Sequence, residues 1–383
     1  MSIQHELPSG GHQPTEEVRD VTQACRDHLD AVNRLHPYPG AVLLRQAMGT
    51  PESLPYATIY EERLKFEDGV VRTLTRVDPK PKYFGSDRQN PYIVSAGDAL
   101  GTGPTGFNRT VIDGLARRGF AVAWLHHQGR HTEIPKDVSQ ALSFAAFLLK
   151  KSVGRSAHHQ HGMLDSLAEH SEYDVSTVIS IGDSRSSMTG EAVDALAPMY
   201  GRTVVSDYNA SCFEHRPTLG ELPLLATSLP HEGIAFLRLM RTLHNDPDVN
   251  ISDYFGTFDL HPKNVINEIA WLVPLMRGDA GRYADAIPLD QTGVRVHLDG
   301  DIWSSGGKAW EPKYAIRPNI HMIRRSKADG SKARHFDIGD PSVQADRFVR
   351  LGRISRELVS GHAPSEIDMR YVEYGLKLVE QPS

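Results

Sequence analysis

Short apolar segments typical of strands alternate with helical segments between residues 91 and 211, and this alternation constrains the fold more than any other feature of the chain. A strand that returns through a helix to the next strand gives parallel neighbours. We therefore expect an α/β fold with a mainly parallel central sheet flanked by helices. The strand-like segments are 91–97, 120–127, 174–182 and 202–211, and the helical segments between them are 107–119, 136–154 and 191–201.

Two further segments precede this alternation. Apolar residues recur at helical spacing from Val18 to Val32, which predicts an amphipathic helix over residues 15–35 within an N-terminal extension of residues 1–55. Residues 57–66 and 70–77 are separated by Glu-Asp-Gly, a hairpin signal that predicts an antiparallel addition at the edge of the sheet.

The alternation breaks in the second half of the chain. Residues 213–287 carry helical patterns without a clear strand, and strand-like segments resume at 293–303 and 319–330. We therefore predict a core of residues 56–212 and 288–383, with a helical cap of residues 213–287 inserted between two core strands. The polar run His-His-Gln-His at 158–161 is expected to be a solvated connector.

Ser184 lies where a predicted strand runs directly into a predicted helix. A nucleophilic serine needs such a sharp turn, and the residues two before and two after it must be small because they nearly collide. Here they are Gly182 and Ser186, one step from the usual Gly-x-Ser-x-Gly pattern. Serine is also favoured at the first turn of a helix, so a helix-capping role is the alternative interpretation.

With Ser184 in this context, residues 56–361 without the insertion resemble the α/β-hydrolase superfamily, whose catalytic residues follow the order serine, acid, histidine. The segment Arg-Val-His-Leu-Asp-Gly-Asp resembles the family's acid loop and favours Asp301. His335, before the last helix, matches the family's histidine loop. The alternative acids are Asp299, in the same loop, and Asp207, which ends an earlier strand.

The same resemblance implies an oxyanion hole built from backbone N–H groups. One donor would come from Arg185, directly after the serine. The other would come from the glycine-rich loop at 97–103, where the candidates are Ala99 and Leu100. The His-Gly pair that the family often carries in this loop is absent from the sequence.

The resemblance therefore implies a serine hydrolase that cleaves a carboxylic ester with an apolar part, through a Ser-His-Asp triad. The same triad would serve an acyltransferase or a peptidase, and an inactive hydrolase-like binding protein is a further alternative. The segment Ile-Gly-Asp-Ser is also similar to the GDSL-type lipases. Those enzymes need Asp-x-x-His near the C-terminus, and no histidine of this sequence has Asp three positions before it.

Composition excludes several other classes. The net charge of −6 gives no basic stripe for nucleic acid, and two cysteines provide neither a disulfide framework nor a paired-cysteine zinc site. The sequence carries no cofactor or metal motif, so none is expected. The first residues show neither the basic start nor the apolar core of a secretory signal, and no apolar run is long enough to span a membrane, so a cytoplasmic location is the expectation.

Overall fold

The computed structural model describes most of the predicted core and leaves the larger part of the predicted cap outside the described residues. The ranges described are 16–35, 39–81, 93–96, 114–126, 152–170, 173–209, 278–303, 310–327, 329–339, 341–367 and 376–378, with the single positions 230, 234, 241 and 308.

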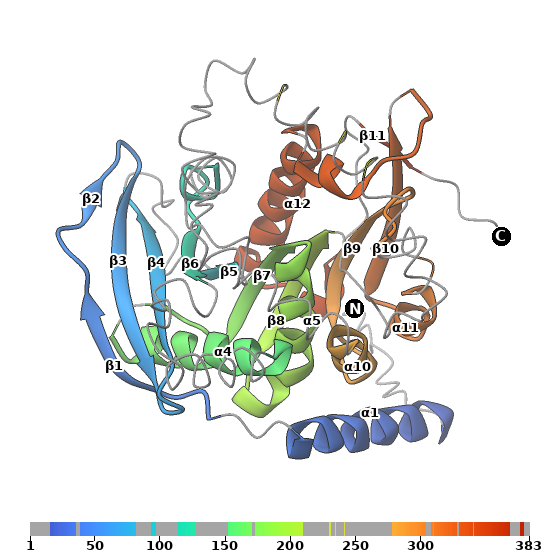
Figure 1. Ribbon diagram of the computed structural model, residues 1–383, viewed down its shortest axis with the longest axis horizontal. Helices are drawn as coiled ribbons and strands as arrows, with labels where there is room; N and C mark the ends of the chain where they lie inside the picture. The colour runs from blue at the N-terminus through green and yellow to red at the C-terminus, as the bar shows by residue number, and fades with distance from the viewer. Residues whose placement is uncertain are drawn as a thin grey trace, which may run out of the picture.

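Within these ranges the strands form one 11-stranded sheet with the order β1-β3-β4-β6-β5-β7-β8-β9-β10-β11, and β2 pairs beside β3 (Figure 1). The centre of the sheet, from β6 to β10, is parallel. This confirms the predicted fold class. The parallel strands are β5 (Ile93–Ala96), β6 (Ala121–Leu125), β7 (Thr177–Asp183), β8 (Thr203–Asn209), β9 (Thr292–Leu298) and β10 (Ile320–Lys327).

The two edges of the sheet are antiparallel. The predicted hairpin is present as β3 (Ala57–Phe66) and β4 (Val71–Pro79), and β4 joins it to the parallel centre through β6. The antiparallel edge is wider than the predicted hairpin, because β1 (Val42–Ala47) and β2 (Glu52–Ser53) extend it. At the other edge, β11 (Leu376–Leu378) pairs antiparallel with β10.

Helices cover both faces of the sheet, as the alternation of buried side chains along its strands requires. Ile179 and Val205 face a core cluster that contains α12 (Pro341–Val359). Their neighbours Val178 and Val204 face the opposite side, where α4 (Val153–His170), α5 (Arg185–Leu196) and α10 (Asp279–Asp285) pack. Four short helices also have described bounds: η2 (Ala197–Tyr200), α11 (Glu311–Ala315), η4 (His335–Gly339) and η5 (Pro364–Glu366).

The predicted N-terminal helix is α1 (Glu16–Leu35), and it packs against α10 at the outside of this helix layer (Figure 1). Val32 is buried there with Leu29 beside it. The Cys25 thiol donates to the carbonyl of Asp285 at 3.2 Å, and His28 Nε2 lies 2.6 Å from the carbonyl oxygen of Arg282. Among the described residues no helix is both long and apolar enough to cross a membrane.

The expectation of a solvated connector at residues 158–161 is wrong. These residues form part of α4, and their side chains are buried. Each histidine has a partner from another part of the chain: His158 Nδ1 lies 2.7 Å from the Tyr200 hydroxyl, His159 Nε2 lies 2.9 Å from Asp68, and His161 Nε2 lies 3.0 Å from the Val193 carbonyl. Burial lowers the pKa of His158 and His159 to about 4 and that of His161 to about 3. Neutral imidazoles with partners can be buried, and a polarity pattern alone does not reveal this.

The predicted cap over 213–287 lies mainly outside the described residues. Its last ten residues are described, and they belong to the core layer. Ala280, Tyr283, Ala284 and Ile287 are buried in the cluster that holds α4 and α5. An insertion in this chain would therefore end before Gly278, ten residues earlier than the sequence pattern indicated.

Candidate active site

Ser184 is held in a strained turn between β7 and α5. Its backbone has φ 55° and ψ −115°, and among the described residues it is the one non-glycine residue with positive φ. Such a conformation costs about 1–3 kcal/mol and persists only where the surroundings fix it. Ser184 precedes the first residue of α5, yet its side chain makes no capping hydrogen bond to that helix. The helix-capping interpretation therefore does not account for this serine.

Gly182 and Ser186, two positions before and two positions after the serine, lie so close together that both must be small. A Cβ added to Gly182 would lie 2.7 Å from the carbonyl carbon of Ser186 and 2.7 Å from the amide nitrogen of Ser187. Ser186 closes the turn on the other side: its hydroxyl donates to the Asp183 carbonyl at 2.8 Å and accepts from the Asp183 amide at 2.7 Å. Serine thus fits where the family pattern has glycine, and it adds two hydrogen bonds to the turn.

The Ser184 hydroxyl points at His335, which begins η4 on a distant part of the chain. Ser184 Oγ lies 2.7 Å from His335 Nε2, and the imidazole is buried. The other ring nitrogen, Nδ1, lies 2.8 Å from Oδ2 of Asp301, which is also buried. A carboxylate only accepts, so Nδ1–H donates to Asp301, and the lone pair of Nε2 is left to accept the Ser184 hydroxyl proton.

Asp301 lies in the turn that follows β9 and is held on both oxygens. Oδ2 accepts from His335, and Oδ1 accepts the backbone N–H of Trp303 at 2.8 Å. The Trp303 ring packs edge-on against the imidazole, with ring centroids 6.4 Å apart. The carboxylate therefore has one orientation, and it fixes the orientation of the histidine ring.

The two alternative acids have other partners. Asp207 is buried on the α12 face of β8 and pairs with Arg350 at 2.5 and 2.9 Å and with Arg347 at 3.3 Å. Burial by itself would raise the pKa of Asp207, but Arg350 and Arg347 outweigh it and hold that pKa below its usual value. A carboxylate engaged by two guanidinium groups anchors α12 on the sheet.

Asp299 holds the loop that carries His335 through a backbone hydrogen bond. Its Oδ1 accepts the backbone N–H of Ala333 at 2.7 Å, two residues before His335. Partial burial raises the pKa of Asp299 above its usual value, against the opposing effect of this hydrogen bond. The contact couples the acid loop to the histidine loop without placing Asp299 on the imidazole.

The predicted oxyanion donors are only partly described. Arg185 opens α5, so its backbone N–H is among the helix donors that have no partner within the helix. Ala99 and Leu100 lie outside the described residues. The site therefore offers one described N–H group, and the dipole of α5 favours negative charge at this end.

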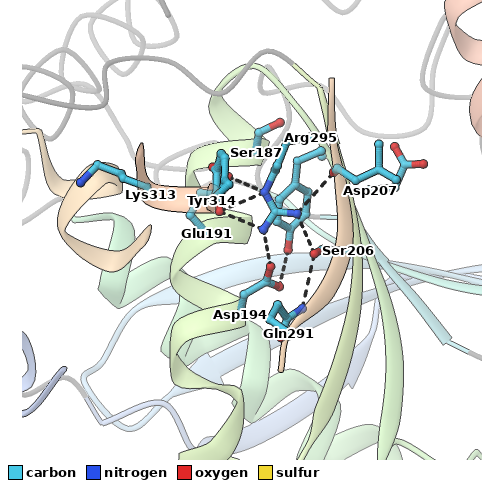
Figure 2. Close-up of polar contacts among 12 residues, drawn as sticks. Ser187, Glu191, Asp194, Ser206, Asp207, Gln291, Arg295, Lys313 and Tyr314 are labelled. Atoms are coloured by element: carbon cyan, nitrogen blue, oxygen red, sulfur yellow. Dashed lines mark hydrogen bonds and ion pairs between the residues drawn. The ribbon is translucent and has the colours of Figure 1, made fainter. Parts of the chain in front are cut away.

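A fully buried ionic cluster docks α5 on the sheet, and sequence reasoning missed it. Arg295 on β9 donates to Glu191 at 3.0 Å and to Asp194 at 2.7 Å, both on α5 (Figure 2). These three side chains have no exposed surface. Tyr314 donates to Glu191 at 2.7 Å, and Arg295 also donates to Ser206 at 2.8 Å. The sequence signal is an arginine within an apolar strand and two acids three residues apart on the helix that follows Ser184.

The GDSL-type interpretation does not match the geometry. The acid that contacts His335 lies 34 residues before it in the chain, whereas that family carries its acid three residues before the histidine. The structure instead brings together the serine, the favoured acid and the histidine in the order that the resemblance to α/β-hydrolases implied.

Comparison with known proteins supports the same architecture. No protein-family model matches the sequence, and no curated protein matches it either. Among solved structures, the methylesterase BT1017 superposes with a TM-score of 0.53 at 11% identity, covering 94% of this chain and 69% of that protein. The hypothetical protein PA2218 from Pseudomonas aeruginosa superposes with a TM-score of 0.51 at 14% identity, covering 83% of this chain and 99% of that protein. This chain has the α/β-hydrolase fold, as the sequence motifs predicted.

Proposed function

We propose that this protein is a serine hydrolase that cleaves a carboxylic ester, with Ser184 as nucleophile, His335 as general base and Asp301 as the acid that orients it. The proposal depends on one observation above all. Ser184, the one non-glycine residue with positive φ among those described, is joined by hydrogen bonds of 2.7 and 2.8 Å to His335 and onward to Asp301. The name of the neighbour methylesterase supports the ester class.

In the acylation step, Ser184 Oγ attacks the ester carbonyl carbon while His335 Nε2 takes the hydroxyl proton. The imidazolium is stabilised by Asp301, and the negative charge on the carbonyl oxygen is stabilised by the Arg185 N–H at the start of α5. The ester C–O bond then breaks, and the departing alkoxide takes the proton from Nε2. An alcohol leaves, and the acyl group remains on Ser184.

Deacylation repeats these roles with water. His335 Nε2 takes a proton from a water molecule, whose oxygen attacks the acyl carbon. Collapse of the second tetrahedral intermediate returns the proton to Ser184 Oγ and releases the carboxylic acid. Ser184 gives the proton of the first step, water gives that of the second, and His335 accepts and returns both; the proposal invokes no cofactor or metal.

The substrate is proposed to carry an apolar acyl or alcohol part. Trp303 lies beside the His335 imidazole and offers an aromatic wall at the reacting end of the site. Residues 210–277 connect β8 to α10, and the last residue of β8, Asn209, accepts the backbone N–H of Ser184. Apolar residues recur at helical spacing in that segment, for example around Phe236 and Trp271, as expected of a cap over an apolar pocket.

A p-nitrophenyl ester assay combined with a fluorophosphonate probe tests the function. The wild-type protein is expected to turn over short-chain esters and to be labelled on Ser184. Ser184→Ala should remove labelling and lower kcat by on the order of 10⁶-fold, to background. Ser176→Ala is the matched control, because this serine is exposed just before the first residue of the same strand, and it should leave activity unchanged.

The outcomes separate the alternatives. Labelling without ester turnover would point to an acyltransferase or a peptidase, and failure to label the folded protein would favour the binding-protein alternative.

For the substrate class, acetyl, butyryl and hexanoyl esters are compared on the wild type and on Trp303→Ala. A reduced preference for the longer esters in the variant is expected. An identical ranking in both proteins would contradict a role for this aromatic wall.

A further inference from the structure

We infer that Arg347 is a positioning residue that holds the strained turn at Ser184 in register with His335. Arg347 lies on α12 and its side chain is 1% exposed. Its Nη1 and Nη2 atoms each donate to one carboxylate oxygen of Asp183 at 2.9 Å, and Nη2 also donates to the Gly182 carbonyl at 3.0 Å. Gly182 and Asp183 are the two residues directly before Ser184. A two-point guanidinium–carboxylate pair fixes orientation as well as distance.

Asp183 connects this contact to the neighbouring strand. Its Oδ1 also accepts the side-chain amide of Asn209 at 2.9 Å. The carbonyl of Asn209 in turn accepts the backbone N–H of Ser184 at 2.9 Å. The Asp183 carboxylate is thus held between α12 and β8, and the amide of the proposed nucleophile is bonded to the same β8 residue. This gives the Asp of the Gly-Asp-Ser segment a function that the proposed chemistry does not assign to it.

The position of Arg347 in the chain makes the contact relevant to the base. Arg347 follows His335 by twelve residues, through η4 and the first turns of α12. The segment that carries the imidazole is therefore bonded to the two residues that precede the serine. A positive-φ serine keeps its conformation only where its surroundings determine it. The 2.7 Å separation of Ser184 Oγ and His335 Nε2 depends on both ends of this connection.

Arg350 provides a matched control on the same helix. Like Arg347 it is buried and pairs with Asp207, and it contributes contacts of 2.5 and 2.9 Å. Arg347 differs because its guanidinium reaches Gly182 and Asp183 as well. Comparing the two arginines separates the anchoring of α12 from the positioning of the serine.

The inference rests on the proposed function. The wild-type protein is therefore assayed first, so that a failure of the proposed function is distinguished from a failure of the inference about Arg347. Arg347→Lys and Arg350→Lys are compared for kcat and KM on p-nitrophenyl acetate, for the rate of fluorophosphonate labelling, and for thermal unfolding. Arg347→Lys is expected to lower kcat and the labelling rate by about 10²-fold, the effect of a displacement near 1 Å, with little change in KM. Arg350→Lys should keep kcat within about threefold while losing a similar amount of thermal stability.

An inert wild type would overturn the proposed function and this inference with it. If the wild type is active, two results would overturn the inference alone. One is a normal kcat in folded Arg347→Lys, and the other is an equal loss of kcat in both lysine variants. If Arg347→Lys does not fold, Asp183→Asn takes its place, because it leaves the Arg347–Asp207 pair intact. It should lower kcat in the same direction by about 10-fold, and an unchanged kcat there would also refute the inference.

Discussion

Replacing Asp301 with Asn tests the identity of the acid and the logic of the site together. The amide is nearly isosteric with the carboxylate, and its oxygen can still accept the Trp303 N–H that holds Oδ1 at 2.8 Å. The contact at Oδ2, 2.8 Å from His335 Nδ1, becomes an NH₂ group that donates. His335 would then accept at Nδ1 and carry its proton on Nε2, which faces Ser184 at 2.7 Å.

The size of the effect follows from this reversal of the tautomer. An imidazole protonated at Nε2 cannot take the Ser184 proton, and the positive charge formed in the reaction loses its carboxylate partner. The same chemical change in known Ser-His-Asp enzymes lowers kcat by about 10⁴-fold, equivalent to about 5 kcal/mol of transition-state stabilisation. KM should change little, because Asp301 is buried on the side of the imidazole that faces away from Ser184.

The assay is steady-state hydrolysis of p-nitrophenyl acetate, with the two other candidate acids as controls. Asp299→Asn keeps an acceptor for the Ala333 N–H, so kcat should stay within about threefold of wild type. Asp207→Asn weakens the pairing with Arg347 and Arg350 and should mainly reduce stability, with less than about tenfold loss of kcat. A loss of kcat in Asp207→Asn that matches or exceeds that in Asp301→Asn would refute the assignment.

Three further outcomes are expected. Gly182→Ala places a methyl group 2.7 Å from the backbone of Ser186 and Ser187, so urea unfolding should show a loss of about 1–3 kcal/mol, and fluorophosphonate labelling should fall; normal labelling would contradict this. Arg295→Met removes the buried cation that pairs with Glu191 and Asp194, and the free energy of unfolding in urea should fall by about 3–5 kcal/mol. A loss below about 1 kcal/mol would show that the cluster does not dock α5. Burial, together with Glu191, raises the pKa of Asp194 to about 7 against the effect of Arg295, and its unfolded value is about 3.9. The folded protein therefore binds the extra proton between these values, and its stability falls as the pH rises through that window, by at most about 1.4 kcal/mol per pH unit. Asp194→Asn should flatten this slope, and an equal slope in both proteins would show that Asp194 is not its source.

The turn at Ser184 could be predicted from the sequence because its steric requirement falls on residues that are close together in the chain. A strand that ends in Gly182 and leads through one serine into a helix needs a small residue where Gly182 meets the backbone of Ser186. The parallel centre of the sheet was accessible for a similar reason, since each strand and helix has its own periodicity. The choice of Asp301 over Asp207 came only from the resemblance of its segment to the family's acid loop, because the order serine, acid, histidine fits both acids.

The polar contacts between residues far apart in the chain could not be predicted, because no sequence pattern indicates them. Arg347 reaches Asp183 across 164 residues of chain, and Arg295 reaches Glu191 across 104. A buried charge and its partner look like two unrelated surface residues until the fold brings them together. The histidines at 158–161 were misassigned for the same reason, since the partners that allow their burial come from the β3–β4 turn, α5 and η2.

The docking of α1 against α10 has a consequence for synthesis on the ribosome. The contacts of Cys25 and His28 are with residues 260 and 254 positions later in the chain. At about 5–20 residues per second, α1 is made roughly 13–50 s before its partner exists. During that time the α10 residues of the cluster that holds Leu29 and Val32 have not been made. The contacts between α1 and α10 therefore cannot form until Asp285 has been made, and until then this side of the amphipathic helix is open to chaperones.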